Sequence, residues 1–314
     1  MKKILIACLM FPALVTLAGD PEPKEESAGY DSTAVAEFLD FLVEADSLNN
    51  LLNYQQGDIP IGSDLALLKI PENFKYLNPA ETDKILVDAW GNPPRETLGM
   101  ILPDSVNPYG YDGWGVIITY QEEGYVDDED AQEIDYDELL TDMQADIKKA
   151  NKQRISQGYG AYELIGWAEP PHYDSNEHKL YWALDLKFDE DLDQNTLNYN
   201  VRILGRRGIL VLNAVSTMDQ LDDVRDSMGD VMALVEFKEG NRYADFNPGV
   251  DKVAAYGIGA LIAGKVAAKA GFFKALGIFL LKGWKIIAIA LVAIGAFLKK
   301  VFLGDKKEQR DIAA

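Results

Sequence analysis

Hydrophobic and polar positions follow a helical spacing near both ends of the globular part of this chain and a strand-like spacing between them. Near its start, Val35, Phe38, Leu39 and Leu42 recur at helical spacing and predict an amphipathic helix that continues to about Asp46. Near its end, apolar residues follow one another at intervals of three and four and predict a last helix, which contains Leu221, Val224, Met228, Val231 and Val235.

Capping signals predict the starts of two further helices. Asn78 precedes a proline at the first helical position, and Glu81 completes a capping-box pattern. That helix is expected to end at Gly91. Asp135 and Glu138 form a similar pair ahead of a stretch with helical periodicity, so they predict a third helix.

In the middle of the chain, apolar residues alternate with other residues at the period of a β-strand. The alternation is regular over residues 180–188, so this strand buries one face, which includes Trp182. It is expected to form a hairpin with residues 162–168. Residues 197–203 and 209–215 predict a second hairpin. Paired strands with helices before and after them indicate an α+β fold, in which helices flank an antiparallel sheet.

The first twenty residues have the pattern of a secretory signal. Two lysines precede an apolar stretch of about 14 residues, and small residues suit cleavage after Ala18. The predicted organisation is a signal peptide at 1–18, a linker at 19–32 and an acidic domain at 33–250. Two alternatives stay open, an uncleaved N-terminal anchor and lipoprotein cleavage before Cys8.

Charge divides the chain into two parts. The 314 residues include 51 acidic and 30 basic residues, a net charge of −21. Residues 19–250 contain 47 acidic and 17 basic residues, a net of −30, whereas residues 251–314 contain 4 acidic and 11 basic residues, a net of +7. This change of sign marks a boundary, and the long apolar runs lie on its basic side.

The basic part predicts a C-terminal transmembrane anchor. Residues 284–303 are largely apolar and would form about 30 Å of helix, with lysines near both ends. Residues 251–283, rich in glycine, alanine and lysine, are expected to lie in the membrane interface or to form the first span of a hairpin. A single span behind a signal peptide places the acidic domain outside the cytoplasm and the charged tail, 304–314, inside it.

Small residues spaced four apart in this basic part indicate a face for helix association in lipid. On a helix, such residues share a stripe where two backbones can approach closely. The pattern predicts a homo-oligomer through Gly259, Ala263, Gly264 and Ala268. The alternative is that these residues only keep an interfacial helix thin.

Composition and motif content exclude several classes of function. The strong acidity argues against nucleic acid as the main ligand, because such binding depends on cations that meet phosphates. Cys8 is the only cysteine, which excludes a disulfide framework and a cysteine-based zinc site. No G-x-S-x-G, H-E-x-x-H, Walker A or dinucleotide-binding glycine motif occurs, and no cofactor is expected.

An acidic run is the first candidate site. Asp127, Asp128 and Asp130 offer oxygen ligands for a divalent cation, the chemistry that calcium prefers. The run lacks the central glycine of an EF-hand loop, so the alternative is a solvated turn that leads into the following helix.

Two predicted hairpin turns contain the other candidates. His172 and Asp174 lie in the expected bend of the first hairpin, near His178, and could hold a metal or act as a general-base pair. Arg206 and Arg207 lie in the turn of the second hairpin and could bind an anionic ligand or a partner's carboxylate. The alternative in both cases is an exposed, solubilising turn.

Several motifs taken together resemble a known family. They are LVDAWGNPP from Leu86, GYVDDED from Gly124, IDYD from Ile134, GWA from Gly166, PPHYD from Pro170, LNYN from Leu197, LGRRG from Leu204 and DKVAAYG from Asp251. Across roughly residues 60–300, the chain resembles a bacterial family of membrane-anchored proteins known by the domain of unknown function number 2167. The resemblance implies an exported domain with a C-terminal membrane anchor. That family has no assigned reaction or catalytic residues.

Two functional hypotheses follow. The first is a non-enzymatic binding or assembly module, held at the bacterial inner membrane with its main domain in the periplasm and bound to an unidentified protein partner. The absence of a nucleophile–base motif favours it. The alternative is a metal-dependent or general-base hydrolase centred on His172 and Asp174. A pocket that joins these residues to Arg206 and Arg207 would favour the hydrolase, whereas separate exposed positions would favour the binding module.

Overall fold

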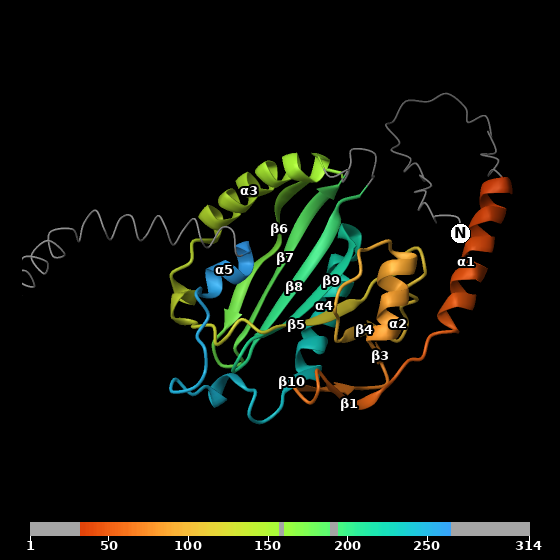
Figure 1. Ribbon diagram of the computed structural model, residues 1–314. Helices are drawn as coiled ribbons and strands as arrows, with labels where there is room; N and C mark the ends of the chain where they lie inside the picture. The colour runs from red at the N-terminus through yellow and green to blue at the C-terminus, as the bar shows by residue number, and fades with distance from the viewer. Residues whose placement is uncertain (1–31, 157–159, 189–193, 265–314) are drawn as a thin grey trace, which may run out of the picture. The chain divides into compact units, whose positions relative to one another are not determined.

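The computed structural model describes residues 32–156, 160–188 and 194–264 (Figure 1). The predicted signal peptide, most of the linker, the predicted anchor at 284–303 and the charged tail lie outside the described residues. A first compact unit runs to Ile262, beyond the boundary at Val250 that the sequence indicates. All of the packing described below belongs to this unit.

The described residues form five α-helices and ten strands, with short 3₁₀ and π turns between them. The helices are α1 (Ser32–Asn49), α2 (Pro79–Asp83), α3 (Tyr136–Ser156), α4 (Leu221–Leu234) and α5 (Ile258–Ala263). The strands are β1 (Gly57–Ile61), β2 (Ala66–Ile70), β3 (Phe74–Leu77), β4 (Gly99–Pro103), β5 (Val116–Gln121), β6 (Tyr162–Asp174), β7 (Lys179–Phe188), β8 (Thr196–Leu204), β9 (Ile209–Thr217) and β10 (Val235–Phe237).

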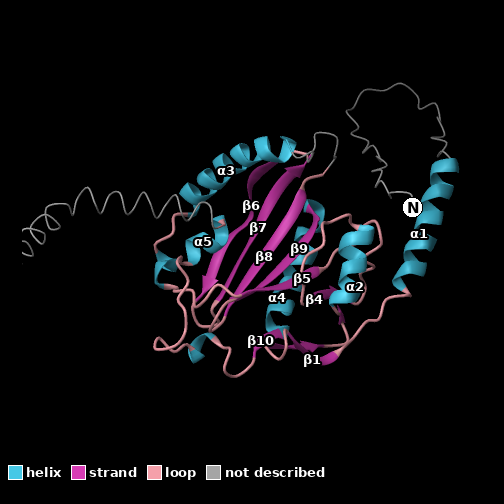
Figure 2. Cartoon of the chain, viewed as in Figure 1, coloured by secondary structure: helices cyan, strands magenta, loops and turns pink. Residues whose placement is uncertain are grey.

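Two antiparallel sheets organise these elements. The large sheet has the order β3-β4-β5-β9-β8-β7-β6, and the small sheet has the order β1-β2-β10. Every strand pair in both sheets is antiparallel. Figure 2 shows the long strands of the large sheet with α3 along one side. The α+β fold and both predicted hairpins, β6–β7 and β8–β9, are therefore confirmed.

The first hairpin turns later than the sequence indicates. We expected residues 170–174 in its bend, but β6 continues to Asp174 and the turn covers residues 175–178. Two prolines are tolerated in β6 because it is an edge strand, where one side of the backbone has no strand partner. A register shift between Glu169 and His172 also interrupts the ladder at the prolines.

The main core lies between one face of the large sheet, the small sheet and α4. Val224, Met228 and Val231 of α4 are fully buried there, as their helical spacing predicts. Val235, which we expected at the end of this helix, instead begins β10 and pairs with Leu68 of β2. The β-branched valine and the following Glu-Phe favour a strand once β2 offers a free edge.

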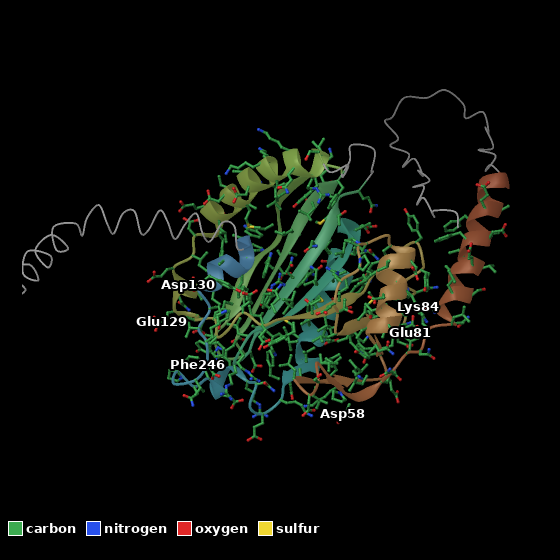
Figure 3. The ribbon with its side chains drawn as sticks, in the orientation of Figure 1. Asp58, Glu81, Lys84, Glu129, Asp130 and Phe246 are labelled. Atoms are coloured by element: carbon green, nitrogen blue, oxygen red, sulfur yellow. The ribbon has the colours of Figure 1, made fainter. Side chains whose placement is uncertain are left out.

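The predicted helix start at Asn78 is confirmed, but its capping box is only half formed. The Asn78 side chain accepts a hydrogen bond from the Glu81 backbone N–H at 3.1 Å. The Glu81 carboxylate bonds instead to Asn53 Nδ2 at 3.0 Å and to Lys84 Nζ at 2.8 Å. Figure 3 shows Glu81 and Lys84 together on this segment. After α2, the chain continues as a π-helical turn, Lys84–Ala89, and Gly91 follows it with φ of +69°.

Helix α3 covers the free edge of β6 with side-chain amides. Gln144 Nε2 donates to the carbonyls of Leu164 and Ile165 at 3.2 and 3.3 Å. Asn151 makes a reciprocal pair with Tyr162, in which Nδ2 donates to the carbonyl at 2.8 Å and Oδ1 accepts from the N–H at 3.2 Å. These bonds replace part of the ladder that an eighth strand would supply.

The amphipathic helix expected near the N-terminus is present as α1, but its apolar face is exposed. Phe38, Leu39, Leu42 and Val43 keep 43%, 55%, 39% and 67% of their accessible surface. Ala45 is buried among the described residues of this helix, which places the contact with the rest of the unit near its C-terminal end.

We expect the double substitution Leu39→Ala and Val43→Ala to change the free energy of unfolding by less than about 0.5 kcal/mol, because neither side chain is buried. Urea denaturation of the full chain measures it. A loss above about 2 kcal/mol would mean that another part of the protein covers this face.

Candidate functional site

Most of the candidate residues meet at one corner of the domain, where four segments distant in the sequence come together. The Gly124 N–H donates to the Arg207 carbonyl at 3.0 Å, and the Asp130 carboxylate reaches the backbone of Ile258. Asp130 and Phe246 lie on the same side of the domain in Figure 3. We call this region the loop corner, and it consists of residues 124–130, 173–178, 205–208 and 240–258.

The three candidate carboxylates of the acidic run have three different partners. Asp127 Oδ1 accepts the backbone N–H of Glu129 at 2.9 Å within its own turn. Asp130 caps α5, since its Oδ1 accepts the Ile258 N–H at 2.9 Å. Asp128 instead bonds to a side chain of the β6–β7 hairpin. Over the described part of the chain, no three His, Cys, Asp or Glu side chains lie close enough together to hold a metal ion.

Asp128 forms a small network with the hairpin turn. The Tyr173 hydroxyl donates to Asp128 Oδ2 at 2.6 Å and lies 3.2 Å from His178 Nδ1, which is itself 3.4 Å from Asp128 Oδ2. Burial, followed by the hydrogen bond to Asp128, raises the pKa of Tyr173, so this hydroxyl stays a donor. The network ties the acidic run to the tip of the hairpin.

His172 and Asp174, the proposed general-base pair, make separate interactions. His172 is exposed, and its ring lies 5.0 Å from the ring of Tyr181. Asp174 Oδ1 accepts the backbone N–H groups of Asn176 and Glu177 at 2.8 and 3.2 Å, and these bonds lower its pKa. Among the residues that the structure describes, no hydrogen bond or ion pair joins His172 to Asp174. Asp174 shapes the hairpin turn.

Both candidate arginines bind groups of the same chain. Arg206 Nε donates to Asp251 Oδ2 at 2.7 Å, and its Nη1 donates to the Gly240 carbonyl at 3.2 Å. Arg207 Nη2 donates to Asn241 Oδ1 at 3.0 Å. Arg206 therefore pairs with a carboxylate of its own chain, and binding of an external anion or of a partner's carboxylate by these arginines stays a prediction.

An aromatic stack that the sequence analysis missed fills the loop corner. The centre of the Tyr125 ring lies 4.4 Å from that of Tyr243 and 3.9 Å from that of Phe246. The His178 ring also packs against Tyr243, with a distance of 4.0 Å between ring centres. The buried Tyr243 hydroxyl donates to the Val126 carbonyl at 2.9 Å. The stacked rings supply the apolar contact around which the charged side chains of the corner are arranged.

We expect the Arg206–Asp251 pair to make stability depend on acid pH. The hydrogen bond from Arg206 holds the pKa of Asp251 below its ordinary value, so the pair stabilises the fold fully above about pH 4. That contribution is lost as the pH falls through the lowered pKa of the folded state. Urea denaturation between neutral pH and about pH 3 should therefore show a flatter pH dependence in Asp251→Asn than in the wild type. Equal slopes would mean that the pair does not contribute.

The residues of the predicted association stripe are only partly described. α5 ends at Ala263, and Gly264 follows with φ of +81°, outside the helix. A Cβ at Gly259 would lie 3.7 Å from Ile134 Cδ1, so this glycine faces the domain. Ala268 lies outside the described residues, and association through the stripe stays a prediction.

None of the helices described in this structure is both long and apolar enough to span a lipid bilayer. The predicted anchor itself, residues 284–303, belongs to the part of the chain that is not described.

Comparisons with known proteins identify a family. No curated protein matches the sequence. Among solved structures, cyanobacterial PsbP (CyanoP) from Synechocystis sp. PCC 6803 is 10% identical, with 60% of this chain and 92% of that chain covered and a TM-score of 0.34. The Saccharomyces cerevisiae Ran-binding protein Mog1p is also 10% identical, with 62% of this chain and 100% of that chain covered and a TM-score of 0.31. Likenesses at these scores support no statement about function. Residues 53–295 match the family described as "Protein of unknown function (DUF2167)", and this chain belongs to that family.

Proposed function

We propose that this protein is a membrane-anchored binding or assembly module of the bacterial envelope, with its domain in the periplasm. The observation that carries the proposal is the role of the charged side chains at the loop corner. Arg206 binds Asp251 and Asp130 caps Ile258, so both hold the segment that leads toward the basic end of the chain. Two charged side chains that the sequence offered for binding an external ion are thus used to fix this segment.

The fixed segment suits a domain that is attached to a membrane. From Gly264, about 20 residues separate the domain from the predicted span at 284–303, which is at most about 70 Å of extended chain. The net charge of +7 over residues 251–314 favours contact with anionic lipid, and the net of −30 over residues 19–250 favours keeping the domain away from it.

The exposed apolar face of α1 supports a binding role rather than a reaction. Phe38, Leu39, Leu42 and Val43 are exposed together on one helix, and contiguous exposed apolar groups of this kind mark contact surfaces. No observation favours the hydrolase alternative, because His172 and Asp174 are not joined.

Membrane fractionation tests the proposal. We expect the full chain, expressed with its own leader, to stay in the membrane fraction after high-salt and alkaline washes. A chain truncated after Gly264 should appear in the soluble periplasmic fraction with an unchanged domain melting temperature. A full chain that the washes release, or a truncated chain that remains in the membrane, would contradict the proposed anchor.

A matched variant distinguishes anchoring by the predicted membrane span from attachment through the surface charge of the lysines before it. Replacing Lys265, Lys269, Lys274 and Lys282 with glutamine removes the interfacial charges and leaves residues 284–303 intact. If the span anchors the protein, this variant should remain in the membrane through both washes. Its release would mean that electrostatic attachment holds the protein instead.

A further inference from the structure

Lys75 occupies a strand position where the fold favours an apolar side chain. Alternate residues of a strand face opposite sides of a sheet, so Lys75 shares a face of β3 with Leu77 and not with Tyr76, which belongs to the main core. Leu77 belongs to a second, smaller core, as does Leu102, which pairs with Lys75 in register. Lys75 is only 7% exposed, so its aliphatic stem is buried beside this second core.

The ammonium group of Lys75 keeps most of its hydrogen-bonding capacity. Its Nζ donates to the Asp104 carbonyl oxygen at 2.8 Å and lies 4.4 Å from the centre of the Tyr54 ring. An ammonium has three donors, and among the described residues no second acceptor bonds to this one. Burial lowers the pKa of Lys75, and the negative charge of Asp104 partly offsets this shift. The two charges therefore lie near each other without forming a direct ion pair.

Lys75 lines a cavity at the surface of the domain. The cavity has a volume of about 340 Å³. Its lining is one leucine and six side chains with polar groups, namely Asn49, Asn50, Tyr54, Gln56, Lys75 and Asp104. Several of these side chains are exposed, so solvent reaches the cavity. Cavities of about 300–1,000 Å³ hold small-molecule ligands, so this one suits a single compact group.

The cavity offers donors and acceptors together. Asn49 uses its Oδ1 and Gln56 its Nε2 in hydrogen bonds within the domain, which leaves Asn49 Nδ2 as a donor and Gln56 Oε1 as an acceptor. The side chains of Asn50 and Asp104 bond to no residue of the described chain. The charges of Lys75 and Asp104 are opposite, so the lining as a whole is neutral.

We propose that this cavity binds a neutral saccharide unit of a ligand. Asp104 would repel an anion and Lys75 would repel a cation, whereas a hydroxyl group both donates and accepts hydrogen bonds and can bond to both side chains. A sugar ring presents several hydroxyl groups in a compact volume. The site rests on the proposed binding role and deepens it by naming the chemistry of a ligand, but it requires no contact with the membrane.

Ligand-observed NMR with the full chain in phosphatidylcholine nanodiscs tests the site. Glucose, galactose, mannose and N-acetylglucosamine are each titrated in saturation-transfer experiments, with empty nanodiscs as the blank. At least one of these sugars should bind saturably, with a Kd at or below about 10 mM. Saturable binding by none of them would overturn the site.

Charged analogues test why the ligand should be neutral. Glucuronate and glucosamine have the ring of glucose but carry a carboxylate and an ammonium group. Each should bind at least about fivefold more weakly than the neutral sugar that binds most tightly, because each meets a like charge in the cavity. An analogue that binds the wild type as tightly as that sugar would contradict a site for a neutral ligand.

Asp104→Asn removes one charge and keeps the shape of the side chain. This variant should weaken the neutral sugar at least about fivefold, because a charge-assisted hydrogen bond is lost, and should strengthen glucuronate, because the repulsion is lost. Asp58→Asn, which changes an exposed aspartate of β1, is the matched control and should alter neither affinity. Unchanged affinities in Asp104→Asn, or equal changes in both variants, would overturn the site.

Lys75→Met removes the ammonium group and keeps an unbranched apolar stem. It should weaken the neutral sugar at least about tenfold with an unchanged melting temperature, whereas Lys69→Met, at an exposed lysine of β2, should have no effect on binding. Equal affinities in Lys75→Met and the wild type would also overturn the site. If Lys75→Met does not fold, the result with Asp104→Asn decides. All of these experiments measure sugar binding and not membrane retention, so failure of this site is distinguishable from failure of the proposed anchor.

Discussion

Replacing Trp182 with alanine should lower the free energy of unfolding by about 3–5 kcal/mol. The indole is 2% exposed and packs under Arg202, so its removal leaves a cavity and uncovers part of the guanidinium. Urea denaturation of the full chain at neutral pH measures the loss.

Trp182→Phe is the matched control for this substitution. It keeps an aromatic ring on the buried face and should cost clearly less than the alanine variant, since most of the apolar contact remains. A loss below about 1 kcal/mol in Trp182→Ala would show that the ring is not packed in the fold.

Gly99→Ala should be of similar severity, for a different reason. Gly99 begins β4 with a backbone φ of +119°, a conformation that residues other than glycine rarely adopt. A Cβ there would also lie 2.5 Å from the Leu77 carbonyl oxygen and against the Tyr76 ring. Backbone strain and overpacking together predict a loss of about 2–6 kcal/mol in the free energy of unfolding.

Gly57→Ala distinguishes the cost of backbone strain from the cost of overpacking. Gly57 also has a positive φ, +84°, but a Cβ there would meet nothing within 4 Å. We expect a loss of about 1–3 kcal/mol from backbone strain alone. Equal losses at the two positions would mean that close packing around Gly99 contributes nothing.

Local signals in the sequence were sufficient to predict most of the secondary structure. Asn78 and Asp135 start helices because a cap needs only backbone N–H groups two or three residues away. The hairpins β6–β7 and β8–β9 are likewise local. β10 was missed because it exists only through pairing with β2, far away in the sequence, while its residues also continue the helical periodicity of α4.

The sequence was sufficient to predict single residues of the candidate site but not the partners that they bind. Asp128, Arg206 and the histidine-containing turn all stood out from the sequence. Their partners did not, since Tyr173 and Asp251 each lie 45 residues from the group that they bind. Pairwise contacts at such separations leave no periodic signal in a single sequence. For the same reason, helical spacing predicted the apolar face of α1 but not that it would be exposed.

The amides that α3 places along β6 have a consequence for how the protein behaves at high concentration. An uncovered edge strand is a template on which a second chain can add, and repeated addition leads to polymers. The paired bonds of Asn151 with Tyr162, and those of Gln144 with Leu164 and Ile165, occupy positions that an incoming strand would need. Detachment of α3 would thus expose a growth site, so local opening of this one helix would give the protein a route to aggregation that needs no global unfolding.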